Sequence, residues 1–174
     1  MRAYVGITDF QWYEFLRARP YLDEINFWRP GSEGSRFGVI SAGEPFLFKT
    51  HSGHGSMLVG GAFLSGYERM RVSRAWELFG EGNGASSLAE MKTSISRYRK
   101  QPIGERDDPY IGCVMLRDPA FFDERRGPFG QVRFAPGIVQ GRSYLLDDGA
   151  DPVVEQAYRR LIGEASTRTL PDLG

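Results

Sequence analysis

The chain has 174 residues, of which 41% are hydrophobic and 13% aromatic, and its 22 Lys and Arg balance 22 Asp and Glu. This length predicts one domain that folds without disulfides. The single cysteine, Cys113, excludes an internal disulfide and a Cys-based zinc finger, and it favours a reducing cytoplasm. Zero net charge excludes a uniformly basic nucleic-acid coat, and no apolar run approaches the ~18–20 residues of a membrane span.

The order of apolar, capping and turn residues predicts the elements along the chain. Strands are predicted over 2–7, 45–50, 57–72 and 110–117, with short strands near 132–134 and 143–146. Helices are predicted over 10–18, 74–79, 88–100 and 152–165, and they begin after the capping residues Asp9, Ser73, Ser87 and Asp151, respectively. Residues 21–38 are predicted to be irregular. The long strand is expected to bend at Gly60-Gly61 or to divide near Ser65-Gly66. Strands and helices are not regularly interleaved, so the expected class is α+β, a small barrel or strongly bent sheet flanked by helices.

The sequence offers no convincing catalytic centre. Both histidines, His51 and His54, lie in one Gly/Ser loop, where no third metal ligand is in view, so we expect no metal and no cofactor. No G-x-S-x-G elbow, Walker loop or Rossmann loop is present.

The aromatic residues are more informative than the titratable ones. Rings in three separate segments come with amide, imidazole and ammonium groups between them, and such a set suits the two faces and the edge of a planar base. An aromatic cluster of this kind also serves as ordinary core, and both readings stay open. The segment that favours a pocket is Asn26-Phe27-Trp28-Arg29-Pro30, because it shows no periodic alternation.

Three arginine groups are candidates for phosphate contacts. Arg69 and Arg71 share one face of a predicted strand, and further basic clusters contain Arg97 with Arg99 and Arg125 with Arg126. Together these clusters could bind phosphates, whereas each one alone is typical of an ordinary solvated surface.

Several segments resemble known proteins. Gly43 to Ser52, followed by the Val- and Gly-rich Leu58–Phe63, resembles the motif of the EVE group of PUA-like domains. Residues 1–100 resemble the N-terminal reader of bacterial predicted HNH restriction endonucleases, through Arg2–Asp9, Asp23–Trp28, Ala75–Gly80 and Ser87–Met91, and the likeness continues more loosely to Gly141.

This resemblance implies a PUA-like (EVE-like) reader domain over 1–166 and a tail, or the start of a linker to an absent HNH nuclease domain, over 167–174. It implies a pocket for a modified base in duplex DNA, a 5-substituted cytosine flipped out of the helix, with the side chains of Trp12, Asn26, Phe27, Trp28, Lys49, His51 and Ser52. Asp9 is a competing case, and we favour helix capping for it. No residue after His54 is a histidine, so an HNH centre is missing and the chain is expected to bind without cleaving.

The expected function is therefore a cytoplasmic DNA-binding module that targets a restriction nuclease, with a homodimer as an option for the full-length nuclease. A reader of modified RNA or of a nucleotide-like small ligand is an alternative. A stand-alone hydrolase that uses His51 with Asp9 or Glu44 is another.

Overall fold

The computed structural model describes residues 1–31, 37–138, 140–147, 149 and 151–169. Within these residues the strands form one seven-stranded sheet and four α-helices surround it. The strands are β1 (Arg2–Ile7), β2 (Glu24–Arg29), β3 (Pro45–Lys49), β4 (Met57–Arg71), β5 (Tyr110–Phe121), β6 (Gly130–Gln131) and β7 (Gly141–Leu145). The helices are α1 (Phe10–Arg17), α2 (Val72–Phe79), α3 (Leu88–Ser96) and α4 (Pro152–Thr169).

The sheet is open and mixed. Its order is β2-β5-β4-β3-β1-β7, with β6 added to the start of β4; β1 and β3 are parallel and the other pairs are antiparallel. β4 is one continuous strand, and its pairing with β5 shifts register between Gly61 and Phe63 and again between Leu64 and Gly66. Such shifts bend a strand. The α+β class with a bent sheet and flanking helices is therefore confirmed.

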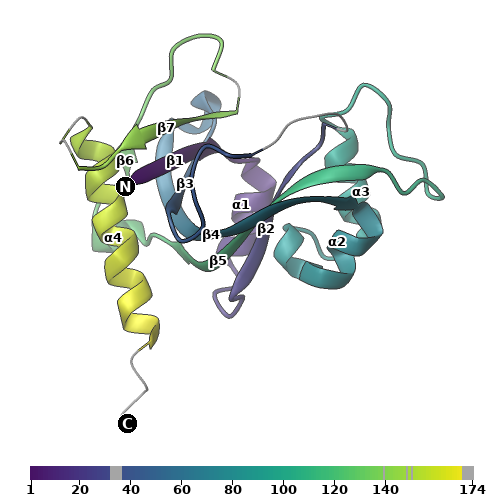
Figure 1. The fold of residues 1–174 in the computed structure, drawn as a ribbon, viewed down its shortest axis with the longest axis horizontal. Helices are drawn as coiled ribbons and strands as arrows, with labels where there is room; N and C mark the ends of the chain where they lie inside the picture. The colour runs from purple at the N-terminus through teal and green to yellow at the C-terminus, as the bar shows by residue number, and fades with distance from the viewer. Residues whose placement is uncertain (32–36, 139, 148, 150, 170–174) are drawn as a thin grey trace.

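Two hydrophobic clusters flank the sheet, and at β3 they lie on opposite faces. The larger one contains the rings of Phe46 and Phe48 and is covered by α1, α2 and α3, whereas the smaller one contains Leu47 and lies beneath α4. Figure 1 shows α4 at one end of the molecule, with α2 and α3 together at the other. No helix among the described residues is both long and apolar enough to span a membrane.

Several expected boundaries were wrong. The segment 21–38 contains strand β2, which pairs with β5 from Glu24↔Arg117 to Arg29↔Gly112. Helix α3 ends at Ser96 rather than near Lys100, β5 runs on to Phe121, and β6 lies at 130–131 rather than near 132–134. Helix α4 extends to Thr169, so residues 167–169 are helical and not a tail, while 170–174 lie outside the described residues.

Candidate functional site

A cleft of about 510 Å³ opens beside the first strand and the start of α1. Its walls come from β1, the β1–α1 connection, α1, β2 and the chain after it, the end of β3, the segment after α3 and the segment before β7. The lining residues are Tyr4, Ile7, Asp9, Trp12, Phe27, Trp28, Arg29, Pro30, Gly31, His51, Tyr98 and Gln140. A volume in the range of ~300–1,000 Å³ with mainly aromatic walls and a few polar groups is typical of a small-molecule site.

Four of the seven expected pocket residues meet in this cleft, namely Trp12, Phe27, Trp28 and His51. The rings also belong to the core: the Trp12 and Phe27 centroids lie 5.6 Å apart, in an edge-to-face arrangement. Both indole N–H groups are already used, since Nε1 of Trp12 donates to the Asn26 carbonyl (3.2 Å) and Nε1 of Trp28 to the Asn83 carbonyl (2.9 Å). The orientation of the two tryptophans is therefore fixed by buried hydrogen bonds, and they border the cleft with little exposed surface, 3% for Trp12 and 9% for Trp28.

Asn26 does not line the cleft. Its side chain is fully buried beside a 3₁₀ turn at Gly80–Asn83, where Nδ2 donates to Asn83 Oδ1 (3.0 Å) and Cys113 Sγ (3.3 Å). Asn26 shares a face of β2 with Trp28, but its short side chain is held by Asn83 and Cys113 and does not reach the cleft. The expectation of an edge-reading amide at this position was wrong, and Asn26 joins β2 to the turn instead.

Lys49 is also outside the cleft. Phe46 and Phe48 face the larger cluster, while Leu47 and Lys49 alternate onto the α4 side of β3. The Lys49 ammonium donates to the Thr50 carbonyl (3.2 Å) and lies 4.5 Å from the centre of the Phe134 ring. Burial lowers the pKa of this ammonium below its ordinary value.

The loop after β3 separates the two histidines and Ser52. Ser52 is exposed at the start of a 3₁₀ turn, Ser52–His54, and does not contribute to the cleft. The His54 ring stacks on Phe10 with centroids 3.8 Å apart, whereas His51 lines the cleft. No cluster of three or more His, Cys, Asp and Glu suited to a metal occurs among the residues that the structure describes.

Asp9 has two tasks in the structure. One carboxylate oxygen accepts from the Trp12 backbone N–H (2.9 Å) and caps α1, as expected. The other oxygen accepts from the Tyr98 hydroxyl and lies 3.8 Å from an Arg97 guanidinium nitrogen. Burial, together with this hydrogen bond to Asp9, raises the pKa of Tyr98 to about 12. The segment after α3 is thereby tied across the cleft to the start of α1.

Sequence reasoning missed three polar lining residues, Arg29, Tyr98 and Gln140. Arg29 donates to Gln140 Oε1 at 2.5 Å, and its guanidinium carbon lies 5.4 Å from the centre of the Phe37 ring. The aromatic segment 26–30 already contained Arg29. Tyr98 and Gln140 are brought to the cleft by contacts over more than 80 residues of chain, for which a single sequence carries no signal.

The expected phosphate-binding arginines occupy three different places. Arg97 approaches Asp9, and Arg99 donates to the Pro30 carbonyl (3.4 Å), so both lie at the rim of the cleft. Arg69 and Arg71 lie at the far end of β4, with guanidinium carbons 5.7 and 4.7 Å from the centre of the Tyr110 ring.

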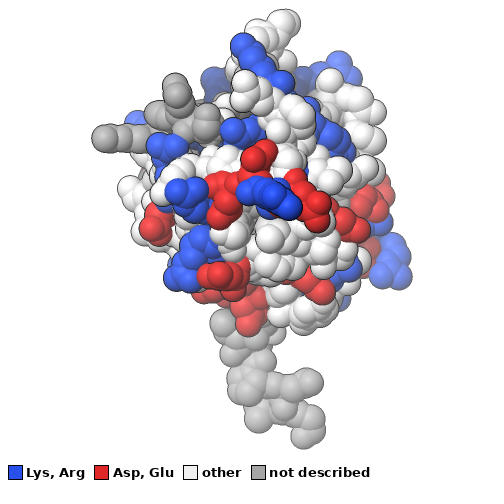
Figure 2. All heavy atoms as spheres, turned by 90° about the vertical axis from the view of Figure 1, so that its right-hand side faces the viewer, with Lys and Arg blue, Asp and Glu red and all other residues white. Residues whose placement is uncertain are grey.

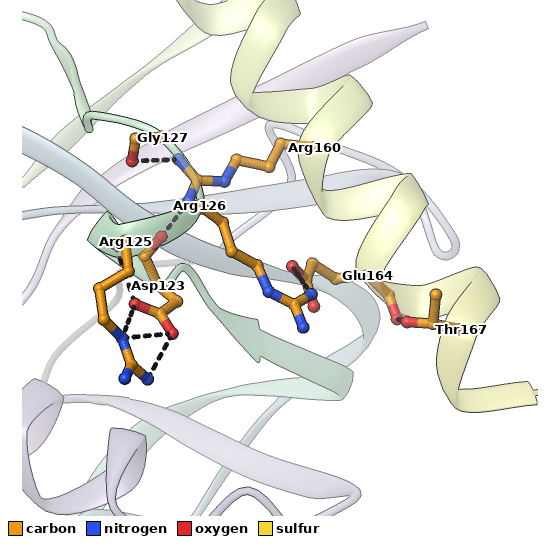
Figure 3. A network of polar contacts seen from close by, with 7 residues as sticks. All are labelled: Asp123, Arg125, Arg126, Gly127, Arg160, Glu164 and Thr167. Carbon is orange, nitrogen blue, oxygen red and sulfur yellow. Dashed lines mark hydrogen bonds and ion pairs between the residues drawn. The ribbon is translucent and has the colours of Figure 1, made fainter.

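Arg126 lines a separate groove of about 680 Å³ beside α4, and neither Arg126 nor its neighbour Arg125 borders the cleft. Arg125 pairs with Asp123 (2.9 Å), whose pKa is lowered to about 2 by hydrogen bonds from Arg125, and Arg126 approaches Glu164 on α4 (3.7 Å; Figure 3). Arg126 thus lies beside α4, on the smaller cluster's side, apart from the arginines at the rim of the cleft and at the end of β4.

Charge is interspersed on the end of the molecule that carries α2 and α3. In Figure 2 acidic side chains cross the middle of this face, and basic ones lie beside and between them. This arrangement matches the zero net charge of the sequence, and it means that any attraction for an anion depends on local groups of arginines.

No family model matches the chain, and no curated protein matches it either. Solved structures of an ASCH protein from Zymomonas mobilis are similar to it: the unaltered protein is 13% identical, over 92% of this chain and 94% of that chain, with a TM-score of 0.48. A mutant form is 14% identical, over 92% of this chain and 96% of that chain, with a TM-score of 0.49. At these values the likeness carries no argument about activity.

Proposed function

We propose that this protein is a nucleic-acid reader that holds a single unstacked base in the cleft between Trp12, Phe27, Trp28 and Tyr98. The observation that carries the proposal is the cleft itself, about 510 Å³ in volume, with aromatic walls and the polar groups of Asp9, Arg29, His51 and Gln140. Rings stack on a base face in a sequence-tolerant way, and polar groups at the edge give selectivity.

Stacking in the cleft can offset the cost of unstacking a nucleotide. Stacking on aromatic side chains contributes about 1–3 kcal/mol per base, which offsets the few kcal/mol needed to unstack a nucleotide. The indole N–H groups of Trp12 and Trp28 are satisfied by backbone carbonyls, so the walls are fixed before a ligand arrives. A pre-organised wall loses little conformational entropy on binding.

The finer proposal follows the sequence resemblance. The base is a 5-substituted cytosine in duplex DNA, and binding directs an HNH restriction nuclease to foreign DNA. In this proposal Arg97 and Arg99, which lie near Asp9 and Pro30, contact the phosphates beside the flipped nucleotide. One methyl group in an apolar pocket discriminates by only about 1–3 kcal/mol, so the expected preference is modest.

A hydrolase based on His51 is less well supported. Glu44, one of its two candidate partners, accepts backbone N–H groups from Arg2 (2.5 Å) and Ser41 (2.8 Å). The other, Asp9, is held by Trp12 and Tyr98. In the part of the chain that the structure describes, no hydrogen bond joins His51 to an acidic side chain.

A binding panel tests the proposal. Otherwise identical duplexes carry cytosine, 5-methylcytosine, 5-hydroxymethylcytosine or N6-methyladenine, and matched RNA is included, all at one stated salt concentration. We expect tighter binding of the 5-substituted cytosines, and we expect Arg29→Ala to abolish that preference. Arg125→Ala, outside the cleft, is the control. Equal affinity for all duplexes would contradict the modified-base proposal, tighter binding of RNA would favour the RNA alternative, and turnover lost in His51→Ala would favour the hydrolase.

A further inference from the structure

One face of the sheet leads out of the cleft, and the registers of three strands define it. Arg29 on β2 pairs with Gly112 on β5, and Gly112 pairs with Arg69 on β4. Side chains of directly paired residues project to the same face of a sheet. Arg29, which lines the cleft, and Arg69 therefore lie in one cross-strand row on one face.

The neighbouring rows on this face carry aromatic and basic side chains. Tyr110 on β5 pairs with Arg71 on β4. Each lies two residues from the Gly112–Arg69 pair on its own strand, so both side chains project to the same face as Arg29 and Arg69. On the other side of the Arg29 row, Phe27 pairs with Val114, and Val114 pairs with Tyr67. The Tyr110 side chain is 45% exposed, and Arg69 and Arg71 are exposed as well.

Gly112, which lies between Arg29 and Arg69 in this row, has no side chain, so the Tyr67 ring can lie over it. A Cβ atom at this position would lie 2.6 Å from the Tyr67 hydroxyl, so the phenol of Tyr67 covers the glycine between the two arginines. Strands lie ~4.8 Å apart, so Arg29 and Arg69 are about 10 Å apart across β5. Two arginines at this spacing, with phenol rings between and beside them, match a surface that contacts a nucleic-acid backbone and stacks on its bases.

We propose that these residues form a track, made of Arg29, Tyr67, Arg69, Arg71 and Tyr110, for the DNA strand that continues from the base in the cleft. The inference rests on the proposed function, because the cleft fixes where the strand enters. The strand leaves the cleft over β2 and crosses β5 and β4, and the contacts lie on one side of the bound base only. Asp108 lies beside Arg71, and its carboxylate accepts from the Ser73 backbone N–H (2.9 Å) and hydroxyl.

The proposed track predicts different effects on DNA binding for a substitution at Arg69, inside the track, and at Arg125, outside it. Arg69→Ala is expected to weaken DNA binding and to make the slope of log K against log salt less steep by about 0.7, as for one lost contact to a single strand. Arg125→Ala is expected to change neither, since Arg125 pairs with Asp123 beside α4.

The experiment measures fluorescence anisotropy with single-stranded and duplex DNA over a salt series. The wild-type chain is compared with Arg69→Ala, Arg71→Lys and Arg125→Ala. Arg71→Lys replaces an alanine substitution because Arg71 donates to the Asp108 carbonyl (2.9 Å) and an alanine there disturbs the fold. Oligonucleotides with the read cytosine at the 5′ end or at the 3′ end show on which side the added nucleotides raise affinity.

The expected result is a lower affinity and a shallower salt slope for Arg69→Ala, with an unchanged ratio of modified to unmodified binding, and a gain in affinity from nucleotides on one side only. Equal losses for Arg69→Ala and Arg125→Ala, or an equal gain from both sides, would overturn the track. The salt slope is also measured on unmodified strands. If the wild-type chain shows no base preference, that result counts against the proposed function. The salt slopes of the wild-type chain and Arg69→Ala on unmodified strands still test the track separately.

Discussion

The Trp12 indole lies directly against Gly84, at the end of the turn that follows α2. Gly84 has a φ of +79°, and a Cβ atom there would lie 2.2 Å from Trp12 Cδ1. The same indole donates to the Asn26 carbonyl and packs edge-to-face on Phe48, with centroids 5.3 Å apart. This wall of the cleft is therefore positioned by a glycine far from it in the sequence.

Substituting this glycine tests the role of the close approach. Gly84→Ala adds about 1–2 kcal/mol of left-handed backbone strain and also forces Trp12 to move, with a further cost of about 1–3 kcal/mol. The matched control is Gly43→Ala, since Gly43 has a φ of +87° and nothing within 4 Å of its added Cβ. Urea unfolding is expected to show a larger loss for Gly84→Ala and a change in tryptophan fluorescence for this variant alone. Equal losses would mean that the indole does not depend on Gly84.

The buried network around Asn83 joins β2 to the turn after α2. Asn83 Nδ2 donates to the carbonyls of Ala75 (3.0 Å) and Gly80 (2.9 Å), and its Oδ1 accepts from Asn26. Asn83→Ala leaves these buried groups unpaired, at about 1–3 kcal/mol each, so we expect a loss of at least ~3 kcal/mol in the free energy of unfolding. Ser86→Ala, at an exposed site nearby, is the control and is expected to change stability by less than ~1 kcal/mol. Comparable stability of both variants in urea would contradict a structural role for the network.

The sequence predicts local features of this fold well. Asp9, Ser87 and Asp151 each cap the helix that follows, because a cap depends on contacts within three residues. Strand β2 was not predicted from the sequence. Its residues Ile25, Asn26 and Trp28 are all buried, so both faces of the strand are covered and apolar and polar residues do not alternate along it. Helix α2 begins at Val72 because Ser73 is held by Asp108 from a distant loop, a contact that propensity alone does not reveal.

The candidate site shows the same division between local and distant contacts. The aromatic residues Trp12, Phe27 and Trp28 were found because one short segment and one helix contain them. Lys49 was misplaced because adjacent strand residues face opposite sides, and the sequence of a strand buried on both faces does not tell which side is which. Asn26 was misplaced because its side chain bonds to Asn83 and Cys113, which are distant in the sequence. Tyr98 reaches the cleft only through its hydrogen bond to Asp9, across the fold.

Lys49 provides a test of burial without an ionic partner. Burial lowers the pKa of its ammonium, so the folded state disfavours the charge that the unfolded chain carries below the ordinary value of 10.5. Stability attributable to this group therefore rises as pH approaches 10.5. Lys49→Met fills a similar volume without a charge, and we expect a gain of the order of 1 kcal/mol at pH 7 that shrinks toward pH 10. Lys100→Met, at an exposed position, serves as the control. Destabilisation by Lys49→Met at pH 7 would show instead that the buried ammonium makes a favourable contact.

Cys113 gives a second test of how tightly β2 and β5 are packed. Its thiol is fully buried, and burial raises its pKa to about 11, against the opposing effect of the hydrogen bond from Asn26. The folded state therefore keeps the thiol protonated, and the stability attributable to it is complete below the ordinary pKa of 9.0 and is lost as pH rises toward 11. At pH 8 we expect an aromatic disulfide reagent to modify the folded chain only as fast as it unfolds, and to modify one thiol per chain immediately in denaturant. Cys113→Ala is the control for the pH dependence, since it removes the thiol and should flatten the stability profile between pH 9 and 11. Rapid modification in plain buffer would show that β2 opens from β5 without global unfolding, and the cleft that β2 lines would then open with it.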